Sequence, residues 1–307
     1  MQRVIFMGTP DFAVPSLQKL IDNGYDIPLV VSQPDKPRGR SKQLVMPEVK
    51  ALAVETGIEV FQPVSLKNEE ASAYIASFEP DFLVVAAYGK ILPKAVLDIP
   101  KKACINVHGS LLPKYRGAAP IQWSVLNGDK TTGVTTMLMG EGLDTGDMLL
   151  KKEVAIGENE TAAALFDRLA VVGADLLIQT LENFDHITSE PQEEAAATYA
   201  PMISRDLCPI DWNEPAATIH NKVRGLAEWP VAVTTLGGKN LKIHAGRVAG
   251  STDKAPGTVI ENRKKIVVAC GNNTSYEIVS LQLEGKKRMQ SDAFLLGHKI
   301  EIGERIG

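Results

Sequence analysis

Apolar residues follow two alternating patterns along the first half of the chain. Short apolar runs predict buried strands at residues 4–7, 27–32, 82–86, 103–107, 133–139 and 148–154. Apolar residues at helical spacing predict helices at residues 12–23, 47–57, 68–78 and 161–183. Strands that alternate with helices are typical of a Rossmann-like, doubly wound α/β fold with a mostly parallel sheet.

The pattern changes after residue 185. Residues 186–206 are polar and lack apolar periodicity, which is typical of an exposed connection. A short helix is predicted at 216–226, and short β-type runs follow at 232–236, 241–248, 257–260, 265–269 and 275–283. Such strands favour a small, OB-like β-barrel. We therefore predict an α/β domain at 1–185, a linker at 186–206 and a C-terminal β-barrel domain at 207–307.

The composition is that of a globular protein, since 44% of the 307 residues are hydrophobic and 23% are charged. The first apolar run is too short for a secretory signal, and no later run approaches the length that spans a membrane. Cys104, Cys208 and Cys270 are isolated and lack the spacing of metal ligands, as expected of reduced thiols. We expect a cytoplasmic protein with no membrane partner and no metal.

Charge is distributed unevenly along the chain. Residues 1–203 hold 18 Lys and Arg against 26 Asp and Glu, whereas residues 204–307 hold 15 against 11. A basic C-terminal portion on an acidic protein is typical of a protein that binds a polyanion, and equally of an ordinary soluble surface.

An Asn-x-His pair lies where the strand at 103–107 gives way to a loop. Because strand side chains alternate with a period of two, Asn106 and His108 share one face. In open α/β sheets ligands bind at the carboxyl ends of the strands. Asp144 follows in a second loop, the glycine-rich stretch 140–146, and we expect both loops to follow parallel strands. The turn after the first strand has Pro10 and Ala13 where a dinucleotide fingerprint needs glycines, so a dinucleotide site is not expected.

An amide, an imidazole and a carboxylate without a serine or cysteine nucleophile favour direct acyl transfer. An amine that attacks an acyl carbon must lose a proton, and it generates a tetrahedral oxyanion. Asn106 can donate to the oxyanion, His108 can do so or relay a proton, and Asp144 can orient His108 or take the proton. Each residue alone also fits a structural role as a turn cap, a core histidine or an Asx-turn residue. Their combination favours an active site.

The Asn-x-His pair, the Ser-Leu-Leu-Pro segment and the downstream Asp resemble the signature of the 10-formyltetrahydrofolate-dependent formyltransferases. The resemblance covers nearly the whole chain, with further matching stretches at 33–37, 61–66, 87–89, 116–122, 210–212 and 229–230. It implies that Asn106, His108 and Asp144 are catalytic, that 1–185 is the formyltransferase domain and that 10-formyltetrahydrofolate is the formyl donor. It also implies a set of folate-contacting residues: Tyr88, Gly89, Ile91, Leu92, Ser110, Leu111, Leu112, Pro113 and Gly142. For the leucines and Ile91, simple core packing is the alternative.

The resemblance further implies that the formyl acceptor is the α-amine of methionyl initiator tRNA, in support of translation initiation. Pro and Gly make 34–42 a loop, and its Arg38, Arg40 and Lys42 are implied to contact the acceptor end. In the C-terminal domain, the basic triplet Lys286, Lys287 and Arg288 can track the tRNA backbone. We expect a monomer.

Two alternatives remain open from the sequence. The acceptor could be a small amine, such as a UDP-linked amino sugar or glycinamide ribonucleotide, although the glycinamide enzymes lack a C-terminal barrel. The chain could instead be a non-catalytic RNA-binding protein with a decayed enzyme domain, which the intact catalytic set argues against. The basic loop at 38–42 is the feature that distinguishes a tRNA acceptor from an amino sugar.

Overall fold

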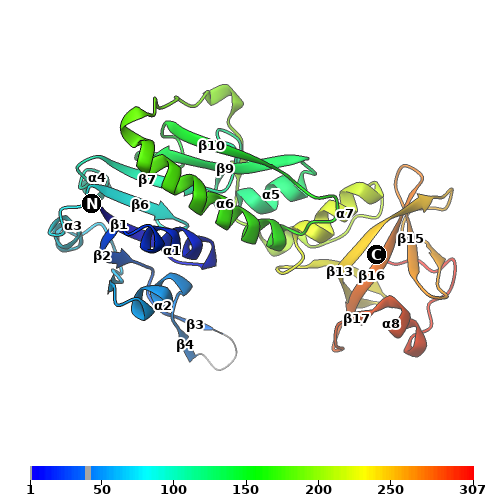
Figure 1. The fold of residues 1–307 in the computed structure, drawn as a ribbon. Helices are drawn as coiled ribbons and strands as arrows, with labels where there is room; N and C mark the ends of the chain where they lie inside the picture. Colours follow the sequence, from blue (N-terminus) through cyan, green and yellow to red (C-terminus); the bar gives the residue numbers. More distant parts are fainter. Residues whose placement is uncertain (1, 39–42) are drawn as a thin grey trace. The chain divides into compact units, whose positions relative to one another are not determined.

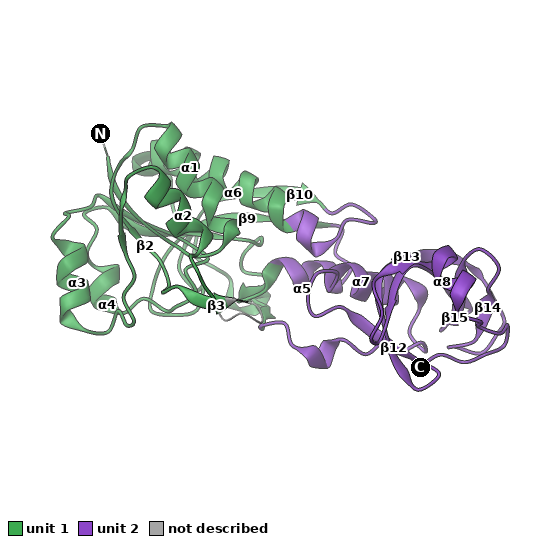
Figure 2. Ribbon diagram, turned by 90° about the horizontal axis from the view of Figure 1, so that it is seen from below, with its two compact units in different colours: residues 1–120, 131–155, 166–201 green, residues 121–130, 156–165, 202–307 purple. Residues whose placement is uncertain are grey.

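The computed structural model describes residues 2–38 and 43–307, which form two compact units (Figure 2). The first unit comprises Met1–Pro120, Thr131–Ala155 and Phe166–Pro201. The second comprises Ile121–Lys130, Ile156–Leu165 and Met202–Gly307. The units therefore do not divide the sequence at a single point.

The first unit is built on a seven-stranded sheet in the order β10-β9-β7-β6-β1-β2-β5 (Figure 1). Its strands are β1 (Arg3–Gly8), β2 (Asp26–Val31), β5 (Glu59–Phe61), β6 (Phe82–Ala86), β7 (Ala103–His108), β9 (Thr131–Leu138) and β10 (Met148–Ala155). Five neighbouring strands, β7, β6, β1, β2 and β5, run parallel to one another. Strand β9 pairs antiparallel with β7, and β10 pairs antiparallel with β9. The predicted Rossmann-like, mostly parallel sheet is confirmed.

The order of strands gives one correction. The loop that carries Asp144 was expected to follow a parallel strand, but it joins β9 and β10, which form an antiparallel pair. A tight loop between sequence neighbours joins antiparallel strands directly, whereas a parallel pair requires a long crossover.

Helices cover both faces of the sheet. They are α1 (Val14–Asp22), α2 (Glu48–Glu55), α3 (Glu69–Ala76), α4 (Lys94–Leu97) and α6 (Ala162–Asn183), with a short 3-10 helix, η1 (Asp11–Ala13), before α1. Helices α1 and α6 lie together on one face, where Phe12 of η1 packs against Phe166 and Lys19 pairs with Asp175 (Figure 1).

Alternation along β7 decides which way the Asn-x-His pair points. Val107 faces α6, since a Cβ built on Gly173 of that helix would lie only 2.9 Å from its Cγ1. Cys104 belongs to the cluster on the opposite face, which includes Ile75 of α3. Asn106 and His108 share the parity of Cys104 and therefore project from the face opposite α6.

Several elements were not predicted, because their sequences show neither strand nor helix periodicity. They are the hairpin of β3 (Lys36–Arg38) and β4 (Gln43–Val45), the parallel pair of β8 (Arg116–Gly117) and β11 (Tyr199–Ala200), strand β5 and helix α5 (Pro120–Leu126). The segment expected to be an exposed connection forms ordered contacts up to residue 201, where the first unit ends. It begins at the last residue of η2 (Phe184–His186) and includes η3 (Glu194–Ala196) and β11, and its Glu190 forms a bridge with Met148.

The second unit contains an antiparallel sheet in the order β12-β13-β16-β15-β14, with β17 paired to β16. Its elements are α7 (Ala216–Gly225), β12 (Ala232–Leu236), β13 (Lys239–Ser251), β14 (Val259–Glu261), β15 (Ile266–Cys270), β16 (Thr274–Leu283), β17 (Met289–Gln290) and α8 (Ser291–Gly297), preceded by η4 (Arg205–Leu207). Register shifts bend β13, and Gly246 at one of them sits against Tyr276, where a Cβ would clash at 2.4 Å. The predicted small β domain is confirmed, although in the described part of the chain the end strands β12 and β14 do not pair to close a barrel.

No helix within residues 2–38 and 43–307 is both long and apolar enough to cross a membrane.

Candidate active site

The imidazole of His108 is buried at the carboxyl end of β7, and a carbonyl oxygen fixes its orientation. Only 5% of the residue is exposed, and its Nε2 lies 2.9 Å from the carbonyl oxygen of Tyr115. Since a carbonyl can only accept a hydrogen bond, Nε2 must carry the proton and donate it. In the neutral ring the lone pair is therefore on Nδ1.

Asp144 faces that lone pair. Its Oδ2 lies 3.7 Å from Nδ1 of His108 and accepts a hydrogen bond of 2.8 Å from the backbone N–H of Gly117. The side chain is only 15% exposed. A proton taken up at Nδ1 of His108 would lie next to a carboxylate, so the pair can accept a proton from a reacting group.

Asn106 lies two residues before His108 on the same face of β7. It is 9% exposed, and its side-chain amide has no hydrogen-bond partner among the described residues. This amide is free to donate to an oxygen on a bound substrate.

The loop that carries Asp144 has a defined conformation. Gly146 approaches β9 so closely that a Cβ would lie 1.9 Å from the carbonyl oxygen of Leu138. The side chain of Gln192 donates from Nε2 to the carbonyl oxygens of Asp144 and Gly146, at 2.8 and 2.7 Å. Ser189 adds a hydrogen bond of 3.0 Å to Asp147. Sequence reasoning missed Gln192, since its partners are backbone carbonyls and its segment has no periodicity.

The side chains expected to contact folate fall into a buried and an accessible group. Tyr88 and Leu92 belong to the cluster on the face opposite α6, and Leu112 packs with Met137 and Met148. The hydroxyl of Ser110 is buried and donates to the carbonyl oxygen of Lys114. For Leu92 and Leu112 this burial agrees with the core packing considered above, and Tyr88 and Ser110 are buried as well.

The accessible group lies in loops at the carboxyl ends of β6, β7 and β9. Ile91 is 72% exposed, and Gly89 and Gly142 are also exposed. Leu111 and Pro113 are half-buried. These residues, unlike the buried group, can reach a ligand without displacing the core.

The residues expected to contact tRNA are only partly described. Arg38 ends β3 and pairs through its backbone with Gln43, whereas Arg40 and Lys42 lie outside the described residues. The base of this hairpin is fixed by Asp35, which accepts hydrogen bonds from Lys50 at 2.8 Å and from Gln62 at 2.8 Å. The hydrogen bonds from Lys50 and Gln62 lower the pKa of Asp35.

The basic triplet lies in the second unit. Lys286, Lys287 and Arg288 are exposed in the turn between β16 and β17, and Arg288 donates from Nε to Ser280 at 3.0 Å.

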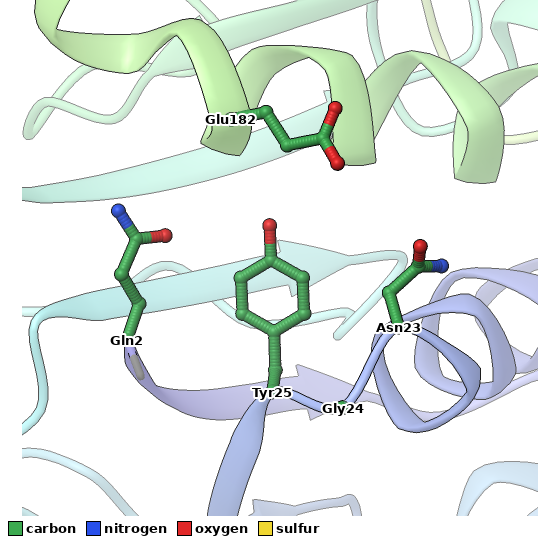
Figure 3. Close-up of a pocket in the computed structure, with 5 residues that line it drawn as sticks. All are labelled: Gln2, Asn23, Gly24, Tyr25 and Glu182. Carbon is green, nitrogen blue, oxygen red and sulfur yellow. The ribbon is translucent and has the colours of Figure 1, made fainter.

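A hollow elsewhere on the first unit is lined by Gln2, Asn23, Gly24, Tyr25 and Glu182 (Figure 3). Gln2 and Tyr25 precede the first residues of β1 and β2, so the hollow is at the amino ends of the parallel strands. His108 is the last residue of β7, so it lies at the carboxyl ends of the parallel strands, away from the hollow. Among the residues described, no three His, Cys, Asp or Glu side chains are grouped to hold a metal ion.

The fold and the site define a formyl transferase. A family model described as formyl transferase matches residues 2–181, and one described as formyl transferase, C-terminal domain, matches residues 202–299. The chain therefore belongs to the formyl transferase family.

Within this family the chain groups with the methionyl-tRNA formyltransferases, which confirms the resemblance seen in its sequence. It is 50% identical to the methionyl-tRNA formyltransferase of Bacillus velezensis, over 100% of this chain and 98% of the relative. It is 48% identical to that of Caldanaerobacter subterraneus subsp. tengcongensis, over 98% of each.

Solved structures share the fold at lower identity. The sugar 3N-formyl transferase WlaRD superposes with a TM-score of 0.70 at 19% identity, covering 94% of this chain and 99% of that one. An N-formyltransferase from Helicobacter canadensis, in complex with folinic acid and dTDP-3-aminofucose, gives 0.69 at 17% identity, covering 91% and 99%. At these identities the likeness concerns the fold alone.

Proposed function

We propose that this chain transfers the formyl group of 10-formyltetrahydrofolate to the α-amino group of methionyl initiator tRNA. The observation that carries the proposal is the distance of 3.7 Å between Nδ1 of His108 and Oδ2 of Asp144. Asn106 lies on the same face of β7, and its side-chain amide is free to bind a substrate oxygen. Relatives about half identical along their whole length, all methionyl-tRNA formyltransferases, support the choice of acceptor.

The three side chains can divide the reaction between them. The neutral amine attacks the formyl carbon, a C–N bond forms, and the formyl oxygen becomes an oxyanion to which Asn106 donates. Nδ1 of His108 takes the proton that the amine nitrogen loses, and Asp144 stabilises the resulting imidazolium. The bond from the formyl carbon to N10 of the folate then breaks, and the leaving nitrogen receives the proton held at Nδ1 of His108.

The folate is proposed to bind along the accessible loops. Gly89, Ile91 and Gly142 would contact it directly, together with Leu111 and Pro113, while Tyr88, Leu92, Leu112 and Ser110 support these loops from the core. An apolar slot with a few backbone groups suits a pterin ring.

The tRNA is proposed to bind through two basic segments. Arg38, Arg40 and Lys42 would contact its acceptor end, and the ordered base of their hairpin at Asp35 supports this role. Lys286, Lys287 and Arg288 would contact phosphates from the second unit. We place the protein in the cytoplasm as a monomer, and its mass in solution at assay concentration tests the oligomeric state.

The decisive experiment measures formyl transfer from 10-formyltetrahydrofolate to charged methionyl initiator tRNA. Uncharged tRNA and a UDP-linked amino sugar are assayed in parallel with the same preparation. We expect transfer to the charged tRNA alone. Transfer to the sugar alone would retain the chemistry and overturn the acceptor, and transfer to none of them would overturn the proposal.

A further inference from the structure

The conformation of Asp144 has to be held by other residues. Its backbone φ is +52°, in the left-handed region that residues other than glycine rarely adopt. Such a conformation persists only where surrounding contacts determine it. Those contacts therefore also determine where the carboxylate lies.

Two residues hold Asp144 at different atoms. Gly117 donates its N–H to the carboxylate, while Gln192 donates to the backbone carbonyl of Asp144 and to that of Gly146. The two N–H groups of the Gln192 amide thus fix two peptide units of the loop, the one between Asp144 and Thr145 and the one between Gly146 and Asp147. The contact from Gly117 is made by its backbone, whereas those from Gln192 require a side chain that can donate.

Arg116 connects the two holding residues. It is 1% exposed, it immediately precedes Gly117, and its Nε donates to Oε1 of Gln192 at 3.0 Å. Its Nη1 pairs with Glu194 at 2.8 Å. Every polar atom of the Gln192 amide is therefore engaged, and its orientation follows from the chemistry of its partners.

The segment around Gln192 is itself anchored on both sides. Before it, Glu190 and Met148 exchange two backbone hydrogen bonds of 2.8 Å. After it, β11 pairs with β8, and the N–H of Arg116 donates to Thr198 at 2.8 Å. A side chain fixed between two such anchors is suited to set the position of a loop.

We propose that Gln192 is a positioning residue for Asp144, a role that rests on the proposed function of the site. It holds the carboxylate against Nδ1 of His108 and contacts no reacting atom itself. Segment 189–200 is thereby part of the formyl-transfer machinery of the first unit.

The test compares Gln192→Met with the matched control Gln179→Met. Methionine keeps the length of glutamine without its hydrogen bonds, and Gln179 is an exposed residue of α6. We expect Gln192→Met to lower kcat roughly ten- to a hundredfold, the cost of a misplacement of about 1 Å. The KM values for folate and tRNA should stay near those of the control. The melting temperature should fall, because Nε of Arg116 and the carbonyl oxygens of Asp144 and Gly146 lose their partner. A merely structural role would lower the melting temperature in the same way but leave kcat per folded molecule unchanged.

Two further measurements decide whether Gln192 acts through Asp144. In an Asp144→Asn background, Gln192→Met should cause no further loss of kcat, whereas losses that multiply would overturn the proposal. Hydrogen exchange of residues 139–147 should accelerate in Gln192→Met and not in Gln179→Met, and unchanged exchange would also overturn it. The exchange measurement needs no substrate, so failure of the proposed acceptor and failure of this proposal remain distinguishable.

Discussion

At the scale of single residues, the site depends on which nitrogen of His108 carries a proton. The carbonyl oxygen of Tyr115 requires a donor at Nε2, and this leaves Nδ1 to face Asp144. The sequence placed His108 at the right strand end but left open whether it donates to an oxyanion or relays a proton. The choice depends on a carbonyl seven residues away, which no motif displays.

Amide replacements of His108 test the proton relay. His108→Asn and His108→Gln place an amide near the positions of Nδ1 and Nε2, so they can donate a hydrogen bond but cannot accept a proton. We expect both to lower kcat by about 10²–10⁴-fold, the usual contribution of a general base, with unchanged affinity for tRNA. If either variant kept more than a tenth of the wild-type kcat, measured under saturating substrates, the relay would be wrong.

The cysteines give a second prediction at this scale. Burial raises the pKa of Cys104 to about 12 and that of Cys270 to about 12, and it also raises the pKa of Cys208. Because the thiolate is the reactive form, all three should resist iodoacetamide at pH 8 in the folded protein. Mass spectrometry should find them labelled rapidly only after denaturation. Rapid labelling of Cys104 without denaturant would show that the face opposite α6 opens.

At the scale of elements, the loop between β9 and β10 is the part of the site under the tightest steric control. Its glycines differ sharply, since a Cβ at Gly146 would collide with a backbone oxygen, while one at Gly140 would meet nothing within 4 Å. The sequence identified the loop as glycine-rich but could not rank its glycines. That ranking depends on how closely each approaches β9.

Alanine substitutions in this loop exploit the difference. We expect Gly146→Ala to displace the loop and lower kcat roughly a hundredfold, as a misplaced carboxylate should. Gly140→Ala, the control in the same loop, should leave kcat within about twofold of the wild type. Equal effects of the two substitutions on steady-state kinetics would contradict this account of the loop.

The sequence predicted the elements whose faces are buried. Strands β1, β2, β6, β7, β9 and β10 and helix α6 lie close to their predicted positions, because burial on one or both faces imposes periodicity. The β3–β4 hairpin escaped prediction because its described residues are charged, proline or exposed. The segment around Gln192 escaped for another reason: its contribution is made by hydrogen bonds to the backbone, which any sequence can accept.

At the scale of the whole molecule, the two units can be observed separately. Trp123, Trp212 and Trp229 are the three tryptophans of the chain, and all of them belong to the second unit. Tryptophan fluorescence therefore reports on unfolding of that unit alone. A signal from the first unit requires another probe.

The pH dependence of this signal follows from His220. Burial lowers its pKa, with Arg224 acting in the same direction and a hydrogen bond to the backbone of Glu158 opposing. The unfolded state, with an ordinary pKa near 6.5, then binds more protons than the folded state below that pH. Stability of the second unit should fall as the pH falls through 6.5.

Melting curves by tryptophan fluorescence between pH 5 and 8 check this. His220→Gln should flatten the pH dependence, whereas the exposed His186→Gln should not. The flattening will be partial, because burial lowers the pKa of His244 as well. A wild-type melting temperature that rises as the pH falls through this range would be inconsistent with the burial of both histidines.

The chain passes between the two units five times, because residues 121–130 and 156–165 belong with the C-terminal part. Leu126 of α5, for example, packs against Gly225, where a Cβ would lie 2.8 Å from its Cδ2. A ribosome making this chain releases α5 about a hundred residues before its packing partner exists. Recombination that exchanged only the C-terminal half between two relatives would likewise join an α5 from one parent to an α7 from the other. Because each unit is built from three separate segments of the chain, a single exchange of sequence cannot transfer either unit whole.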